Sequence, residues 1–323
     1  MIDLLLLFVP FFALVLMGWG AARSGLLALD GIGALNTFVL FFGLPAMVFR
    51  LSASGALQQP GLFSLLLAYG LAGGLIMLLA LAWGMHAGLS RRDGGLVALV
   101  TAFPNTGFLG LPLLISLLGP QAAGPVAATL VIDVLILSSL CLAWAHSKPE
   151  QGGHDGAWQA LPASLRGALR NPLLWSMAAG LVASLLGLPL PHPVDETLRL
   201  LSLSASPAAL FTLGAMLARS QSSASTQVSV PHGRMAVWTL LKLAAHPAGV
   251  WLFAQALSVA GMQVSRVGLL TLMLAAALPS ASNVSMLAER EGANTHLVAR
   301  IILWTTVAAI LTLSLWASAL GVG

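Results

Sequence analysis

Charge is scarce in this sequence. Only 7% of its 323 residues are Asp, Glu, Lys or Arg, whereas 58% are hydrophobic. A water-soluble domain of this composition would expose large apolar patches, so the composition excludes a soluble globular protein. The apolar residues form runs of roughly 18 to 25 residues, the length that an α-helix needs to cross about 30 Å of hydrocarbon. Because the strands of a membrane barrel would show shorter alternating segments, the sequence predicts an all-α integral membrane protein.

Cysteine is almost absent, and the common catalytic motifs are missing. The single cysteine, Cys141, lies inside an apolar run, which excludes an intrachain disulfide and indicates a packing role. The sequence contains no H-E-x-x-H or G-x-S-x-G motif, and its histidines are not paired at metal-ligand spacing. Its basic residues are scattered singly between apolar runs, which argues against nucleic-acid binding. These absences disfavour an enzyme, a resident metal and a cofactor.

The apolar runs are separated by charged or Gly/Pro-rich segments and predict ten membrane spans. The spans begin near residues 4, 33, 62, 95, 122, 171, 197, 235, 267 and 295. With the N-terminus outside, nine Lys or Arg residues fall in inward loops and three in outward loops. The positive-inside bias therefore predicts a multi-pass protein of the plasma (bacterial inner) membrane with both termini outside. The inward residues are Arg23, Arg91, Arg92, Lys148, Arg166, Arg170, Arg219, Arg234 and Arg290, and the outward residues are Arg50, Arg199 and Arg266.

A hydrophilic segment at residues 146–170, expected to be a cytoplasmic linker, divides the chain into halves of five spans, 1–145 and 171–323. Both halves carry a P-A-x-x-F element in their second span. Both also have a proline break in their fourth span, at Pro104 and Pro279. Because five is an odd number, the second half enters the membrane in the opposite direction to the first. The pattern predicts an inverted repeat.

The two proline breaks are predicted to lie near the middle of the membrane. Pro104 is about nine residues into its span and Pro279 about twelve, which places them roughly 14 and 18 Å deep. Since lipid cannot satisfy the backbone groups that a proline frees, both breaks must face protein or a wet cavity. The half-helices that follow direct their positive N-termini to one level from opposite faces, which predicts an anion site. The candidate binding residues are Pro104, Asn105, Thr106, Pro279, Ser280, Ser282 and Asn283.

One isolated break would indicate an ordinary kink, with the asparagine satisfying the freed carbonyl groups. Two matching breaks in corresponding spans favour a binding site instead. We expect the Asn105 side chain to cap the half-helix that follows it and still to offer an amide to a ligand. Ser280, Ser282 and Asn283 are expected to act similarly in the second half.

Besides Arg300, three ionisable residues are predicted to lie within spans, where a charge at the bilayer centre costs at least about 2.5 kcal/mol. Asp133 lies at the depth of both breaks and is expected to carry a proton, bind an ion or pair with a cation, unless it is a protonated structural acid. Lys242 lies about two turns into its span, so we expect its ammonium group to reach the cytoplasmic surface. His246 either bonds a carbonyl freed by Pro247 or is a proton-sensitive neighbour of Asp133.

Several motifs together resemble the auxin efflux carrier family, which includes bacterial members and the plant PIN-FORMED carriers. The motifs are PNT-x-x-x-G followed by LPLL, K-L-x-x-H-P, and ALP-x-x-x-N-x-x-x-x-A-E-R-E. The resemblance implies the ten-helix fold of bile acid symporters and sodium/proton antiporters, with spans 4 and 9 crossing at their breaks. It also implies a scaffold of spans 1, 2, 6 and 7, a moving domain of spans 3 to 5 and 8 to 10, a homodimer formed through the scaffold, and elevator-type movement of a carboxylate.

We therefore expect a secondary transporter of a small organic anion, either an auxin-like monocarboxylate or a dicarboxylate similar to malate or malonate. In this hypothesis the residues at the breaks bind the carboxylate, and Asp133, His246 and Lys242 provide ion coupling or shape the cavity. One alternative is a symporter or antiporter coupled to sodium or protons. The others are an intramembrane enzyme and a membrane sensor that binds its ligand without transporting it.

Overall fold

The computed structural model describes residues 2–147, 155–222 and 232–322, and most of these residues are helical. Six helical segments are long and apolar enough to cross a membrane. Four shorter apolar helices coincide with the other predicted spans or with half of them. An all-α, multi-pass membrane protein is thus confirmed. The long segments are Gly31–Ala53, Leu62–His86, Pro120–His146, His192–Arg219, Gly233–Val259 and Thr295–Ala319; the shorter ones are Val9–Arg23, Thr106–Leu118, Pro172–Leu185 and Arg266–Ala276.

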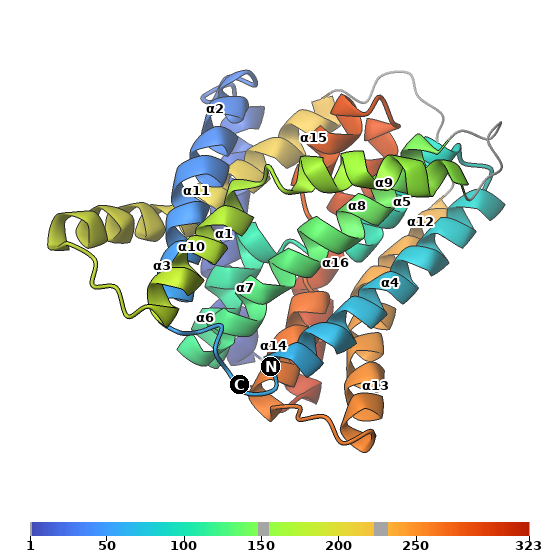
Figure 1. Ribbon diagram of the computed structural model, residues 1–323. Coiled ribbons are helices and arrows are strands. Elements are labelled where there is room, and N and C mark those ends of the chain that lie inside the picture. The colour runs from blue at the N-terminus through green and yellow to red at the C-terminus, as the bar shows by residue number, and fades with distance from the viewer. Residues whose placement is uncertain (1, 148–154, 223–231, 323) are drawn as a thin grey trace.

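The first half of the chain forms the blue-to-green helices of Figure 1. Several of its spans consist of more than one element, because short π-helical turns (η) interrupt them. In chain order the elements are α1 (Ile2–Arg23), α2 (Gly31–Phe38), η1 (Val39–Gly43), α3 (Leu44–Ala53), α4 (Leu62–His86), α5 (Arg91–Ala102), η2 (Thr106–Gly110), α6 (Leu111–Leu118), the 3-10 turn η3 (Pro120–Ala122), α7 (Ala123–Val131), η4 (Ile132–Leu137) and α8 (Ser138–His146).

The second half forms the yellow-green to red helices of Figure 1. Part of the predicted linker is itself a helix, α9, which packs along α8 and which the sequence analysis did not anticipate. The elements are α9 (Asp155–Ala168), α10 (Pro172–Leu185), α11 (His192–Ser222), α12 (His232–Leu240), η6 (Leu241–Ala245), α13 (His246–Val259), α14 (Arg266–Ala276), α15 (Asn283–Arg290) and α16 (Thr295–Ala319).

Three of the π-helical turns accommodate prolines. η1, η2 and η6 each end two residues before a proline, at Pro45, Pro112 and Pro247. A proline lacks an N–H group and its ring displaces the carbonyl one turn earlier, so a widened turn lets the helix continue past it. η4 has no such proline after it and contains Asp133. Turns of this kind are frequent at functional sites.

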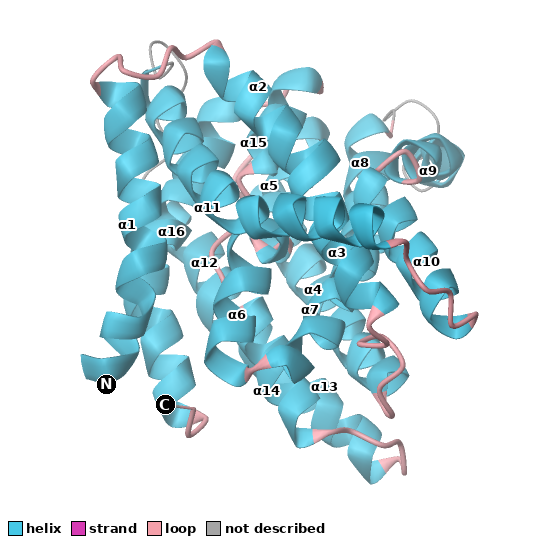
Figure 2. Cartoon of the chain, turned by 90° about the vertical axis from the view of Figure 1, so that its left-hand side faces the viewer, coloured by secondary structure: helices cyan, strands magenta, loops and turns pink. Residues whose placement is uncertain are grey.

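The two interrupted spans run in opposite directions through the molecule (Figures 1 and 2). α5 begins at the end that carries α9, and α6 continues toward the end where α1 starts and α16 finishes. α14 begins at this second end, and α15 finishes near α9. The start of α1 and the end of α16 therefore lie at the same end of the molecule, opposite α9.

Helices α1 and α11 join the two halves through a close contact of glycines. A Cβ atom on Gly18 would lie 1.9 Å from the carbonyl oxygen of Phe211, and one on Gly214 would lie 1.8 Å from that of Val15. Small residues allow membrane helices to approach at backbone distance, where van der Waals contacts stabilise their association. The contact therefore requires glycine at both positions.

Gly18→Ala is expected to lower the unfolding temperature, because the added methyl group overlaps backbone that can move only if the helices separate. Overpacking of this kind costs about 1–3 kcal/mol. Gly20→Ala on the same helix is the matched control, since a Cβ atom there meets nothing within 4 Å. Thermal unfolding of the detergent-solubilised proteins measures the difference. Equal unfolding temperatures for the two variants would contradict the close contact.

Candidate functional site at the crossing of two broken helices

The two breaks meet in an isolated antiparallel β-bridge between Pro104 and Ser280. On one side of the bridge the N–H of Asn105 donates to the carbonyl oxygen of Pro279 at 2.8 Å. On the other side the N–H of Ala281 donates to the carbonyl oxygen of Phe103 at 3.0 Å. The N–H of Ser280 also donates to the hydroxyl oxygen of Thr305 on α16, at 3.1 Å. Because lipid offers no hydrogen bonds, each break depends on the other to satisfy its backbone.

Asn105 is buried beside this bridge, and its side-chain amide has no hydrogen-bond partner among the described residues. The expectation that this side chain caps the following half-helix is wrong. Its backbone carbonyl oxygen instead accepts bonds from the N–H groups of Leu109 and Gly110, at 3.1 and 3.0 Å, as the widened turn η2 requires. Ser282, before α15, also makes no side-chain cap. A buried polar group without a partner costs about 1–3 kcal/mol, and this amide therefore has unused hydrogen-bonding capacity.

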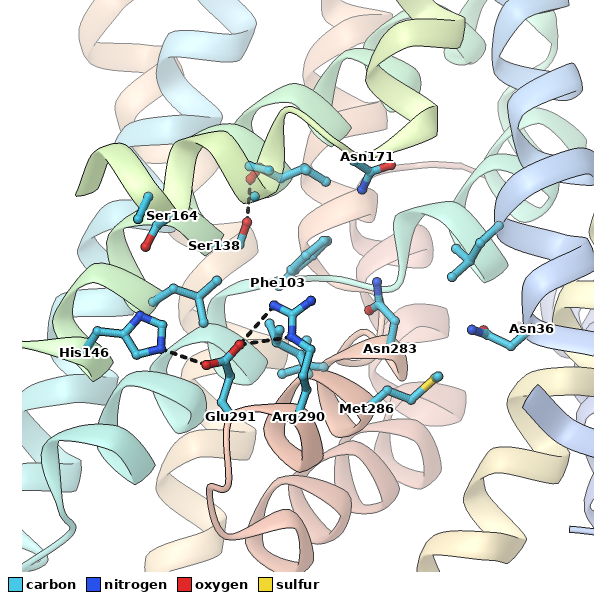
Figure 3. Close-up of a pocket in the computed structure, with 18 residues that line it drawn as sticks. Asn36, Phe103, Ser138, His146, Ser164, Asn171, Asn283, Met286, Arg290 and Glu291 are labelled. Carbon is cyan, nitrogen blue, oxygen red and sulfur yellow. Dashed lines mark hydrogen bonds and ion pairs between the residues drawn. The ribbon is translucent and has the colours of Figure 1, made fainter. Parts of the chain in front are cut away.

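Two adjoining cavities border the crossing. The crossing cavity, of about 310 Å³, is lined by Pro104, Asn105, Gly107 and Phe108. The outer cavity, of about 610 Å³, extends to α9, and Asn283 lines both (Figure 3). The N–H groups of Gly107 and Phe108 lie in the first turn after the break, where a helix has no acceptor of its own for them. This end of the crossing cavity therefore suits an anion.

The structure divides the predicted binding residues into two groups. Pro104, Asn105 and Asn283 line the cavities, whereas Thr106, Pro279, Ser280 and Ser282 do not. The hydroxyls of Ser280 and Ser282 are buried and have no partner in the described part of the chain. Ser282 borders a void of about 10 Å³ between α11, α15 and α16, which has room for about one water molecule. The hydroxyl of Thr106 lies 3.4 Å from the carbonyl oxygen of Pro104.

Asp133 belongs to a buried polar cluster outside these cavities. The hydroxyl of Tyr69, on α4, donates to its Oδ1 atom at 2.8 Å. The Oδ2 atom makes no hydrogen bond within the described residues, although the whole side chain is buried. The carboxyl group thus has capacity for one further donor, a proton or a cation.

The prediction that Lys242 reaches the cytoplasmic surface is wrong. Its side chain is fully buried, and its ammonium group donates to the carbonyl oxygen of Ala276 at 2.6 Å. Ala276 is the last residue of α14, whose terminal carbonyl groups have no partner within the helix and form the negative end of its dipole. Lys242 therefore caps the first half of a broken span. This tertiary hydrogen bond holds the side chain inside the protein instead of letting it extend to water.

His246 does not bond the carbonyl freed by Pro247. That carbonyl, of Leu243, accepts instead from the indole N–H of Trp316 at 2.8 Å. The Nδ1 atom of His246 lies 3.4 Å from the ammonium group of Lys242, and its ring lies against Tyr69 with centroids 5.6 Å apart. The histidine therefore adjoins the Asp133 cluster through Tyr69 and Lys242.

Sequence reasoning missed several polar residues around the cavities and in the Asp133 cluster. Arg170 and Arg290 were counted only as loop cations, yet both line the crossing cavity. Asn36 and Asn171 line the outer cavity. Tyr69 is the only tyrosine in the chain and lies in an otherwise apolar run, which is a signal that could have drawn attention to it. No local pattern brings α2, α9 or α15 to one cavity.

A chain of three charged or titratable groups lies in the wall of the outer cavity (Figure 3). Glu291 accepts bonds from Arg290 through Oε1, and its Oε2 atom lies 2.7 Å from Nε2 of His146. Partial burial opposes ionisation of Glu291, but the hydrogen bonds from His146 and Arg290 outweigh it and hold the pKa of the carboxyl below its ordinary value. Glu291 is therefore fully ionised at neutral pH.

Comparison with known proteins identifies the family. The model of the family described as "Membrane transport protein" matches residues 4–317, nearly the whole chain. The chain belongs to this family. The resemblance to the auxin efflux carrier family is thereby confirmed, and the protein is a membrane transporter.

Relatives of this membrane transport protein include carriers from distant organisms. A protein of Rhizobium meliloti named "Putative malonate transporter" is 27% identical over 318 residues, which cover 95% of this chain and 93% of the relative. An uncharacterized transporter of Escherichia coli, YfdV, is 22% identical over 95% of this chain and 94% of its own. One from Methanothermobacter thermautotrophicus is 24% identical and covers 94% of each chain. The similarity thus spans both halves of the membrane transport protein.

Trp316→Phe is expected to lower the free energy of unfolding by about 1–3 kcal/mol, because the carbonyl of Leu243 loses its donor inside the membrane. Pro247→Ala restores an N–H four residues after Leu243, so the same substitution should cost less in that background. Unfolding of the four proteins of this double-mutant cycle measures the coupling. Additive effects would show that Trp316 does not compensate for Pro247.

Proposed function

We propose that this protein is a secondary transporter of small organic anions, either monocarboxylates or dicarboxylates such as malonate. The observation that carries the proposal is the bridge between Pro104 and Ser280, which joins two oppositely directed broken helices beside a cavity with an unpaired amide. Discontinuous helices of this kind form substrate sites in many secondary transporters. The name of the Rhizobium meliloti relative supports a small dicarboxylate.

In this proposal the carboxylate binds at the start of the second half of span 4. Gly107 and Phe108 line the crossing cavity, and their first-turn N–H groups are the proposed donors to the carboxylate, where the helix dipole favours a negative charge. The amide of Asn105 donates to the same carboxylate, and Asn283 provides the matching amide from α15. Thr106, Pro279, Ser280 and Ser282 support the bridge rather than contact the substrate.

We further propose that ten spans form two inverted repeats, 1–145 and 171–323, joined by the linker 146–170. Helices of the proposed scaffold pack most extensively on one another, as α1 does on α11 and α3 on α10. Those of the proposed moving domain do the same, as α4 does on α5 and α13. This division supports elevator-type movement, with the scaffold forming a homodimer. The basic loops support a plasma (bacterial inner) membrane protein with both termini outside.

Coupling of transport to sodium or protons is the second candidate, and the unpaired Oδ2 atom of Asp133 favours it. Against sodium, the cluster holds one carboxylate and already contains the ammonium group of Lys242 near it. A sodium site usually gathers several oxygen ligands. We therefore propose that Asp133 shapes the buried cluster, with His246 packed against Tyr69.

Asn105→Ala is expected to reduce carboxylate uptake into proteoliposomes at least about tenfold, because a hydrogen bond to a charged group is worth about 1.5–3 kcal/mol. Gln58→Ala is the control, since it removes an exposed amide that lines neither cavity. The unfolding temperatures of both variants show whether they are folded. Unchanged uptake by folded Asn105→Ala would remove this residue from the site, and binding without any uptake by the wild type would favour a sensor.

Asp133→Asn should retain uptake within a few-fold and should be insensitive to an imposed sodium gradient, because the asparagine oxygen can still accept the bond from Tyr69. Uptake by wild type and variant is measured with and without the gradient, and then with a pH gradient. Wild-type uptake that follows either gradient and loses this dependence in the variant would establish the coupled transporter instead.

A further inference from the structure

Arg290 lines both the crossing cavity and the outer cavity, and among the described residues it is the one cation shared by the two walls. It is the last residue of α15, the half-helix that begins at Asn283 near the bridge. Its side chain is 72% exposed, and its guanidinium group points toward the middle of the outer cavity, between Glu291 and Asn283 (Figure 3). The proposed transport site therefore has a positive group beyond the crossing.

The present partner of this guanidinium group is a carboxylate of the protein itself. Nε and Nη2 of Arg290 donate to Oε1 of Glu291 at 3.1 and 2.9 Å. Glu291 is held in turn by His146 through its other oxygen, Oε2. Arginine carries five N–H donors in a planar fork that matches a carboxylate. Glu291 thus accepts from the same guanidinium group that a substrate carboxylate would use.

A second arginine, Arg170, also lines the crossing cavity. Arg170 belongs to the turn between α9 and α10, whereas Arg290 belongs to α15. With Glu291 ionised, two cations face one anion around the cavities, and the helix N-terminus at Gly107 adds positive potential. A dianion gains roughly twice as much as a monoanion from such a field. The charge distribution therefore selects for substrates with two negative groups.

We propose that Arg290 is the specificity-determining residue of the transport site and binds the second carboxylate of a short dicarboxylate, in competition with Glu291. The inference rests on the proposed function, because it assumes that the first carboxylate binds at the crossing beside Asn105. Arg170 contributes to the same subsite from the turn between α9 and α10. Glu291 offsets one of the two positive charges around the cavities and weakens the binding of anions that carry only one charge.

The experiment compares uptake of malonate and of its monomethyl ester into proteoliposomes at neutral pH. Arg290→Gln should raise the KM for malonate about tenfold or more while changing the KM for the monoester much less, since only malonate loses a charge-assisted bond. Glu291→Gln should lower the KM for malonate, because the competing carboxylate is gone. Arg199→Gln is the matched control: it breaks an exposed Arg–Glu pair of similar length outside the cavities.

The opposite signs of the two cavity variants separate specificity from misfolding, because a misfolded Glu291→Gln protein cannot bind malonate more tightly. Equal KM changes for both substrates in Arg290→Gln, or changes no larger than in Arg199→Gln, would overturn this inference and leave the proposed function intact. A wild-type protein that transports the monoester as well as malonate would do the same. Absence of uptake of any carboxylate by the wild type would overturn both.

Discussion

A backbone that is interrupted inside a membrane has no water to satisfy its free N–H and C=O groups, and this constraint shapes the centre of the molecule. The break at Pro104 and the break at Pro279 answer it jointly, because each donates a backbone hydrogen bond to the other across the bridge. A break in only one of the two spans would leave its free backbone groups without these partners. Thr305 satisfies the remaining N–H of Ser280, so the junction is anchored to α16 as well.

The same requirement explains the polar residues that surround the junction. Lys242 satisfies the terminal carbonyl of α14, and Trp316 satisfies the carbonyl that Pro247 frees. The side chains of Asn105, Ser280 and Ser282 are exceptions, since their polar atoms are buried without a partner among the described residues, and of the three only Asn105 lines the crossing cavity. In the function proposed above, the substrate provides the partner that the amide of Asn105 lacks. Arg290 extends this recognition toward the outer cavity.

The sequence was sufficient for the membrane class, the positions of the apolar helices and the places of both breaks. Apolar periodicity and proline chemistry are local, so Pro104, Pro279 and the buried depth of Asp133 could be identified without a structure. The roles that depend on partners could not. Lys242 was misplaced because its acceptor lies 34 residues away, on the end of α14. Arg290 resembled an ordinary loop cation because the cavity is assembled from distant helices.

The two sides of the crossing differ in the polar groups that they present. The cavity side offers amides, helix N-termini and arginines, which suit an anion, whereas on the other side Asp133 bonds Tyr69 and Lys242 bonds the last carbonyl of α14. A density map of the protein saturated with malonate tests this account most directly. The account predicts ligand density in the crossing cavity, with a carboxylate at Asn105 and the N–H groups of Gly107 and Phe108. Density for malonate at another site, with the amide of Asn105 still unpaired, would contradict it.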